Sequence, residues 1–196
     1  MQKLKETNPD YLILVNEENR LPADFESTVE MVVAKNAEGA EYTLEKRTYA
    51  EFLRLRADLL ENDGIQTELI STYRSLAQQE AVFASNVEKY GLEHTKKYVS
   101  NPGHSEHHTG LAIDVSVMVD GKIPRARQDL FNIDHLLQIV HKKLPLYGFI
   151  LRYPKGKEPI TRIGYEPWHL RYIGSAEIAK EITDKGICFE EYWQTR

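Results

Sequence analysis

Hydrophobic positions along the chain follow two spacings, one typical of strands and one typical of helices. Short apolar runs predict strands at residues 11–15, 27–33, 68–72, 111–119, 149–153 and 168–173. Apolar residues at helical spacing predict helices at residues 48–63, 75–90, 92–99, 133–144, 175–183 and 188–193. Helices and strands are mixed, without the strict alternation of a parallel doubly wound sheet. We therefore expect an α+β fold with a small, mainly antiparallel sheet flanked by helices.

Two of the predicted helices carry start and stop signals. Thr48-Tyr49-Ala50-Glu51 and Ser75-Leu76-Ala77-Gln78 match the capping-box pattern, in which Ser or Thr is followed three positions later by Glu or Gln. Gly64 and Gly91 stand where the two apolar repeats stop, as is usual for residues that end helices. Turn signals predict a loop at 101–103, a hairpin turn at 120–121 and a lid-like loop at 154–159.

Composition places the chain among globular proteins and excludes several functions. The 196 residues contain no repeat, linker or low-complexity tract, so we expect one domain, 1–196, with a motif-bearing core at about 66–185. The net charge is −5 and basic residues are interleaved with acidic ones, so no nucleic acid partner is expected. Cys188 is the only cysteine, which excludes an intrachain disulfide and a cysteine-rich zinc site, and we expect a buried thiol.

The first apolar run is too short to enter a membrane. Residues 11–15 are far fewer than the apolar core of a signal peptide or a membrane-spanning helix requires. We therefore expect no membrane span and a cytoplasmic location for the chain as given, although a chain trimmed of its export signal would have the same sequence. The sequence does not determine the oligomeric state.

The clearest chemical signal is the stretch Ser105-Glu106-His107-His108-Thr109-Gly110-Leu111-Ala112-Ile113-Asp114. It places an imidazole, His107, seven residues before a carboxylate, Asp114, with a Thr-Gly break and a strand between them. Alternate side chains of that strand face opposite ways, so Asp114 shares a face with small residues, where a cavity fits. Gly110 allows the tight approach that brings His107 over Asp114. Zinc accepts His nitrogen and Asp oxygen, but a surface His and a turn-capping Asp would give the same spacing.

A second cluster, Glu166-Pro167-Trp168-His169, supplies a third ligand. His107, Asp114 and His169 together would form a zinc site with one position open for water. Strict strand alternation would place Glu166 and His169 on opposite faces, but the intervening proline cannot donate to a sheet ladder and predicts a local bend. That bend would bring both side chains toward one site and leave Glu166 free to act as general base. We expect the tryptophan to form a wall of this site.

A cationic group is available upstream of these motifs. Arg74 lies where a predicted strand meets a predicted helix, and its guanidinium could bind a carboxylate or stabilise a developing oxyanion. A surface salt bridge is the alternative. Gln79, one turn into the helix, could face the same cleft.

We place His108 outside the ligand set and leave His104 open between orienting a ligand and lying exposed. The default for the remaining histidines is a structural or surface role: His94, His135 and His141.

Taken together, these motifs resemble the D-alanyl-D-alanine carboxypeptidase family, zinc enzymes that trim bacterial peptidoglycan precursors and include the vancomycin-resistance carboxypeptidases and dipeptidases. The resemblance rests on Ser-x-His-x-x-Gly-x-Ala-x-Asp at 105–114, Glu-Pro-Trp-His at 166–169, and Tyr-Arg-Ser at 73–75 with a Gln five residues after the Arg. Matching stretches at 149–154 and 169–172 extend it over roughly half of the chain. More distant kin with the same zinc scaffold are lysostaphin-type endopeptidases and the hedgehog signalling domain.

The resemblance implies a fold like that of hedgehog and the D-Ala-D-Ala peptidases, with one zinc ion per chain. It implies that His107, Asp114 and His169 hold the zinc and that Glu166 is the catalytic base. Arg74 is implied to stabilise the oxyanion or to anchor the substrate.

The same resemblance implies a substrate and the residues that bind it. The partners would be peptidoglycan precursor peptides ending in D-Ala, whose terminal D-Ala is removed by a metal-activated water. Ser105 and Gln79 match family positions that contact the carboxylate end of the peptide, and Tyr73 and Arg152 are further candidates. A role in antibiotic resistance is implied by the vancomycin-resistance members.

Three alternatives stay open at this stage. The chain could act as a dipeptidase on D-Ala-D-Ala or as an L,D-carboxypeptidase on the tetrapeptide, which differ in the room left on the amino side of the scissile bond. A non-catalytic zinc-binding interaction module, as in hedgehog, is a second alternative, against which Glu166 argues because a binding site needs no general base. A phage-type wall endopeptidase would usually need a wall-binding domain, for which no residues remain.

Overall fold

The computed structural model describes residues 9–196 of the chain. Its strands are β1 (Met31–Lys35), β2 (Glu41–Glu45), β3 (Thr67–Ser71), β4 (Ala112–Val117), β5 (Phe149–Leu151) and β6 (His169–Tyr172). Its α-helices are α1 (Lys46–Asp63), α2 (Leu76–Tyr90), α3 (Leu92–Tyr98), α4 (Arg127–Asn132), α5 (Asp134–Lys143), α6 (Glu158–Thr161), α7 (Ala176–Asp184) and α8 (Phe189–Trp193). Short 3₁₀ helices are η1 (Phe25–Thr28), η2 (Glu106–Thr109) and η3 (Leu144–Tyr147).

The strands form two separate sheets. β3, β4, β6 and β5 form, in that spatial order, a four-stranded sheet in which every neighbouring pair is antiparallel. β1 and β2 pair as an antiparallel hairpin of their own. This mixture of helices with antiparallel sheets confirms the expected α+β fold.

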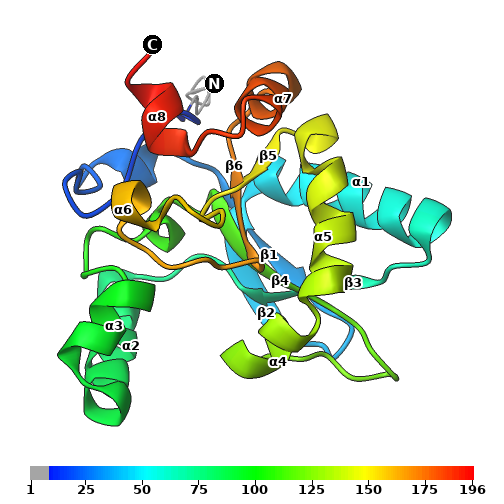
Figure 1. Ribbon diagram of the computed structural model, residues 1–196, viewed down its shortest axis with the longest axis horizontal. Helices are drawn as coiled ribbons and strands as arrows, with labels where there is room; N and C mark the ends of the chain where they lie inside the picture. The colour runs from blue at the N-terminus through cyan, green and yellow to red at the C-terminus, as the bar shows by residue number, and fades with distance from the viewer. Residues whose placement is uncertain (1–8) are drawn as a thin grey trace, which may run out of the picture.

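One face of the four-stranded sheet carries the main hydrophobic core. Alternation along β4 turns Ile113, Val115 and Val117 to this face, where they share one buried cluster with Leu55 of α1 and Leu137 of α5. Figure 1 shows α1 and α5 next to each other on this side of the molecule. Burying an aliphatic side chain of this size stabilises the fold by about 1.5–3 kcal/mol, so this face contributes strongly to the stability of the sheet.

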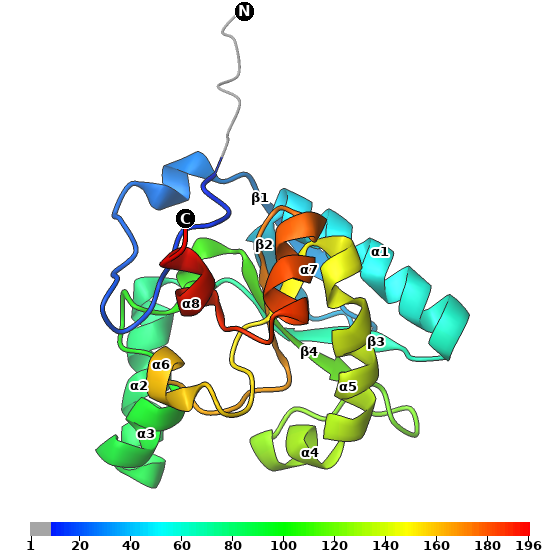
Figure 2. The same ribbon diagram turned by 45° about the horizontal axis from the view of Figure 1, so that its top comes forward.

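The opposite face of the sheet carries polar side chains. On β4 it presents Asp114, flanked by Ala112 and Ser116, as the alternation predicts. On β6 the cross-strand partners of Asp114 and Ala112 are His169 and Arg171. The paired helices α2 and α3 extend away from the body at one edge (Figures 1 and 2).

The N-terminal apolar run at 11–15 is not a strand, contrary to the sequence prediction. It consists of a turn followed by backbone without strand pairing. The carbonyl oxygens of Tyr11 and Ile13 both accept hydrogen bonds from Arg171 Nη2, at 2.9 Å. Side-chain donors therefore satisfy carbonyl groups that a neighbouring strand would otherwise bind.

The following hairpin also differs from the prediction. The strand predicted at 27–33 begins only at Met31, because η1 occupies the preceding segment, and β2 is not predicted from the sequence. Helix α1 begins at Lys46 rather than at Thr48. Its N-cap is Glu45, whose carboxylate accepts hydrogen bonds from the next backbone N–H groups at 2.9 and 2.7 Å. Glu is not among the common N-cap residues, so the sequence does not signal this start.

Several other local predictions are confirmed. Ser75 and Gln78 form a capping box at the start of α2, and Gly64 ends α1 with a φ of +67°. Asp120 and Gly121 both have positive φ, 50° and 73°, as a tight hairpin turn requires. α4 and α6 are not predicted, since helices this short span fewer than two turns and show no apolar repeat.

Two further expectations concern membranes and the single thiol. None of the helices in residues 9–196 has both the length and the apolar character needed to cross a bilayer. Cys188 is buried, as expected, and burial raises the pKa of its thiol to about 11.

Candidate active site

The polar face of the sheet brings a carboxylate and an imidazole together. Asp114 of β4 and His169 of β6 are direct cross-strand partners, a position that places their side chains next to each other on one face. Asp114 Oδ1 lies 3.0 Å from His169 Nδ1. Strand register alone therefore brings together two of the three side chains of the cluster.

His107 reaches the same point from η2. Its Nδ1 lies 2.6 Å from the carbonyl oxygen of Thr72. Because a carbonyl oxygen only accepts hydrogen bonds, Nδ1 carries the proton and Nε2 keeps a lone pair that can bind a metal ion. That Nε2 faces Asp114 Oδ2 at 3.4 Å, and the rings of His107 and His169 stand nearly perpendicular, with centroids 4.9 Å apart. Gly110 ends η2 with a φ of +71° and lets the chain turn directly into β4.

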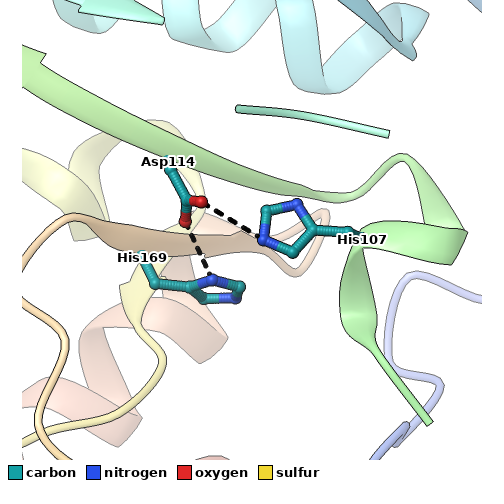
Figure 3. A group of neighbouring side chains, drawn as sticks. All are labelled: His107, Asp114 and His169. Carbon is teal, nitrogen blue, oxygen red and sulfur yellow. Dashed lines mark ion pairs between the residues drawn. The ribbon is translucent and has the colours of Figure 1, made fainter. Parts of the chain in front are cut away.

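These three side chains fit a divalent metal ion. One ligand atom from each of His107, Asp114 and His169 lies within 4.8 Å of the others, and Figure 3 shows both imidazoles turned toward the carboxylate. All three side chains are largely buried, and Asp114 Oδ1 has no hydrogen-bond partner in the described part of the chain. The negative charge of a buried carboxylate must be balanced by a cation or by hydrogen bonds. Two nitrogens and one oxygen are a set of ligand atoms suited to zinc.

The protonation of the group agrees with ligand chemistry for His107. Burial and the Arg74 cation lower the pKa of His107 to about 4, so its imidazole is neutral at pH 7. Burial would raise the pKa of Asp114, but His107 and His169 outweigh it and hold the pKa well below its usual value. Burial opposes protonation of His169, while Asp114 and Glu106 raise its pKa to about 9. A metal cation between the three side chains would replace the additional proton that this raised pKa leaves on His169 at pH 7.

Glu166 stands beside the cluster without joining it. Its Oε2 lies 3.9 Å from His169 Nδ1, and the bend predicted at the proline is present as a turn in which His169 N–H donates to the Glu166 carbonyl at 3.2 Å. Burial raises the pKa of Glu166 to about 7, the range in which a carboxyl group both accepts and releases a proton near neutrality. His141, for which a structural role was the default, supports this turn from α5, with Nε2 2.7 Å from the Pro167 carbonyl oxygen.

The cluster opens into a cavity of about 280 Å³ that three other predicted residues line: Arg74, Gln79 and Ser105. Arg74 Nε is buried with no hydrogen-bond partner within residues 9–196, so its guanidinium is not a surface salt bridge. Gln79 Nε2 donates to the Ser100 carbonyl at 2.7 Å, while its Oε1 is buried and unpartnered in the described chain. Unsatisfied buried polar atoms lining a cavity are available to a ligand.

Two predicted substrate contacts do not line this cavity. Arg152 is fully buried and bonded to Glu106 and Glu190, so its guanidinium is occupied inside the fold rather than open to substrate. Tyr73 points toward a different depression, and its hydroxyl donates to Glu26 Oε1 at 3.0 Å. Neither side chain is therefore placed to contact a substrate in this cavity.

The adjacent histidines have other partners. His108 is buried, with Nδ1 2.6 Å from the Arg74 carbonyl oxygen and Nε2 accepting from the Gly103 N–H, so it lies outside the ligand set, as expected. His104 is neither exposed nor next to a ligand, since its Nδ1 faces the Asn16 carbonyl oxygen at 2.9 Å.

Several residues of the site are not found by sequence reasoning. Trp168, expected as a wall, does line the cavity, but so do Arg127 and Tyr98, with Arg127 Cζ 4.1 Å from the centre of the Tyr98 ring. Tyr153 packs its ring on His169 at a centroid distance of 4.9 Å. Tyr98 and Arg127 come from α3 and α4, and no local sequence pattern links them to the two motifs. Tyr153 lies in a loop within the matching stretch 149–154, which does not by itself indicate a contact with His169.

A family model described as VanY, D-alanyl-D-alanine carboxypeptidase, matches residues 41–175. Among similar proteins, YodJ of Bacillus subtilis is 35% identical over 192 residues, which are 95% of this chain and 68% of YodJ. VanXYC of Enterococcus gallinarum, a bifunctional D-Ala-D-Ala dipeptidase and carboxypeptidase, is 39% identical over 141 residues, 70% of each chain.

Solved structures with similar folds include zinc- and ligand-bound peptidases. VanYB in complex with D-Ala-D-Ala matches with a TM-score of 0.78 and 29% identity, over 95% of this chain and 98% of that one. A variant of the D,D-pentapeptidase VanY in complex with Zn(II) matches with a TM-score of 0.76 and 29% identity, over 93% and 98%. The L,D-carboxypeptidase LdcB matches with a TM-score of 0.74 and 32% identity, over 94% and 86%.

Proposed function

The chain belongs to the VanY family of D-alanyl-D-alanine carboxypeptidases, and from this premise we propose that it removes the C-terminal D-Ala from peptidoglycan precursor peptides. In this proposal His107, Asp114 and His169 hold one zinc ion per chain. The observation that carries it is the buried group of these three side chains, with Glu166 beside it and a cavity in front of it.

When bound, zinc would polarise the scissile carbonyl and lower the pKa of a water molecule. Glu166 accepts the proton of the attacking water and passes it to the leaving amine. The support is its position, 3.9 Å from His169 Nδ1, and its pKa of about 7, which burial raises.

In this proposal Arg74 stabilises a negative charge, either on the oxyanion that forms during hydrolysis or on the substrate carboxylate. Its side chain lines the cavity and its Nε has no partner in the described residues, so the guanidinium can bind the oxyanion or the substrate carboxylate. Gln79 offers an unpaired Oε1 in the same cavity. Ser105 also lines it, although its hydroxyl already accepts a hydrogen bond from His107 N–H at 3.3 Å.

Proteins similar to this chain act on different peptides. VanXYC is described as both a D-Ala-D-Ala dipeptidase and a D-Ala-D-Ala carboxypeptidase, and LdcB is an L,D-carboxypeptidase, so similar proteins differ in substrate. We place the D,D-carboxypeptidase first because the family model carries that activity. The match to VanY from a VanB-type vancomycin-resistance cassette extends the proposal to antibiotic resistance.

A metal analysis combined with three substrates tests the proposal. We expect one zinc per chain and release of D-Ala from a pentapeptide faster than hydrolysis of free D-Ala-D-Ala or of the tetrapeptide. Faster turnover of either alternative would change the substrate but keep the enzyme class. Stoichiometric zinc with no hydrolysis of any of the three would instead identify a non-catalytic zinc-binding module.

A further inference from the structure

A cluster of buried charges lies on the same face of the sheet as the candidate metal site. Glu106 Oε1 accepts hydrogen bonds from Arg152 Nε at 2.7 Å and from Arg171 Nη1 at 2.8 Å. Arg152 turns its other two nitrogens to Glu190 of α8, at 2.9 and 2.6 Å. The side chains of Glu106, Arg152 and Arg171 are 0% exposed. Two guanidinium groups thus face two carboxylates away from water.

Local structure explains why this cluster meets the site. Alternation along β6 puts Arg171 on the same face as His169, two residues earlier. In η2, Glu106 directly precedes His107, so one short helix delivers a side chain to the ligand group and another to the buried cations.

The second oxygen of Glu106 is the informative atom. Oε2 lies 3.5 Å from His169 Nε2. Neither atom has a hydrogen-bond partner elsewhere in the described chain, and both are buried. Two orphaned buried atoms that face each other, an acceptor and the outer nitrogen of an imidazole, are the components of a carboxylate–histidine–metal arrangement.

We propose that Glu106 is a positioning residue, which holds the His169 ring through Nε2 so that Nδ1 is presented to the cation shared with Asp114 and His107. The inference rests on the proposed function only in taking that site as a zinc site. Glu106 accepts a hydrogen bond from the Nε2–H group of His169, which fixes the tautomer of the ring. The same bond makes Nδ1 a stronger ligand for the cation. Arg152 and Arg171 anchor Oε1, so Oε2 has little freedom to leave the ring.

The chain offers a matched control for this role. Glu106→Gln and Glu190→Gln each remove one negative charge from beside the buried Arg152 guanidinium, but only Glu106 also bonds Arg171 and faces His169. Zinc affinity is measured by competition with a chromogenic chelator on both variants and the wild type. We expect Glu106→Gln to weaken zinc binding by about 10–100-fold, while Glu190→Gln stays within about threefold of wild type. Equal zinc affinities for all three proteins would overturn the proposal, and so would equal losses in both variants.

A second measurement needs no variant and guards against a Glu106→Gln protein that does not fold. In zinc-loaded wild type labelled with ¹⁵N-histidine, we expect His169 to carry its proton on Nε2, hydrogen-bonded and protected from exchange. A proton on Nδ1 would overturn the proposal. These readouts do not depend on turnover, so a protein that binds zinc in this way but hydrolyses no peptide removes the proposed function and leaves the role of Glu106. A wild type that binds no zinc removes both.

Discussion

Asp114 Oδ1 and His169 Nδ1 are 3.0 Å apart because their residues are direct partners across the antiparallel strands β4 and β6. A one-residue slip of either strand would turn its side chain into the hydrophobic core. The apolar face of β4, packed against α1 and α5, therefore holds this register in place. The same packing that stabilises the sheet positions the candidate ligands.

The ligand group predicts linked losses of metal and activity. We expect His107→Ala and His169→Ala each to abolish both stoichiometric zinc binding and D-Ala release, because two remaining protein ligands hold zinc poorly. His135→Ala is the control, since His135 is exposed on α5, and should keep both. Zinc content by elemental analysis and peptide turnover on the same samples provide the check. Full activity in either ligand variant would remove that histidine from the site.

Glu166 predicts a separation of metal binding from catalysis. Glu166→Gln keeps the shape of the side chain but cannot accept a proton, so we expect zinc content to be unchanged. Hydrolysis should fall by about three orders of magnitude, as expected for a missing general base. Steady-state kinetics on the zinc-loaded variant measure this. A variant within tenfold of wild type would place the general base elsewhere.

The raised pKa of Glu166 predicts a pH dependence of stability in the chelator-treated protein. Burial raises this pKa from 4.5 to about 7, so between these values the folded chain binds more protons at Glu166 than the unfolded chain. Stability from this group is therefore lost as the pH rises through that window, by roughly 3 kcal/mol at pH 8.

Chelator-treated Glu166→Gln lacks this titration. We expect it to be more stable than chelator-treated wild type at pH 8 and equal to it at pH 4, in urea denaturation at both pH values. A difference that does not change with pH would contradict the shifted pKa.

Arg74 predicts a loss of rate without a loss of metal. Its guanidinium lines the cavity and has an unpartnered Nε in the described chain, so Arg74→Ala should lower kcat/KM by about 10²–10³-fold while zinc content stays the same. Arg54→Ala is the control, because Arg54 is an exposed residue of α1 paired with Glu51. Unaltered kinetics in Arg74→Ala would reject its role at the developing charge.

Gly110 predicts a structural requirement at the turn between η2 and β4. Its φ is +71°, and an added Cβ would lie 2.6 Å from Met31 Cε and 3.1 Å from the Glu45 nitrogen. Gly186 has a similar φ of +61° with open space around it. We expect Gly186→Ala to destabilise the fold by about 1–2 kcal/mol from backbone conformation alone. Gly110→Ala should cost more, because the backbone of Glu45 cannot move aside freely; similar denaturation midpoints for the two variants would contradict this.

Much of the site can be predicted from the sequence because its signals are local. The alternation that sends Asp114 and Ile113 to opposite faces is a property of any strand. The capping box at Ser75 and the left-handed turn at Gly64 depend on neighbouring residues only. The two motifs around His107 and His169 likewise carry their chemistry in their residue types.

Other features depend on contacts between distant parts of the chain. Arg152 reads as a possible substrate contact in the sequence, yet it is bonded to Glu106, 46 residues away, and to Glu190, 38 residues away. The apolar run at Tyr11 has the pattern of a strand, but the carbonyl oxygen of Tyr11 accepts a hydrogen bond from Arg171, 160 residues away.

The sequence by itself therefore determined the α+β class, and it predicted the candidate ligands and the candidate general base by residue type. Only the tertiary structure decided which arginines face the cavity and which are bonded to carboxylates inside the fold, and which carboxylate lies behind His169. The physical reason is that burial and pairing of a charge depend on side chains brought together by folding, whereas strand alternation and helix capping depend on the backbone within a few residues.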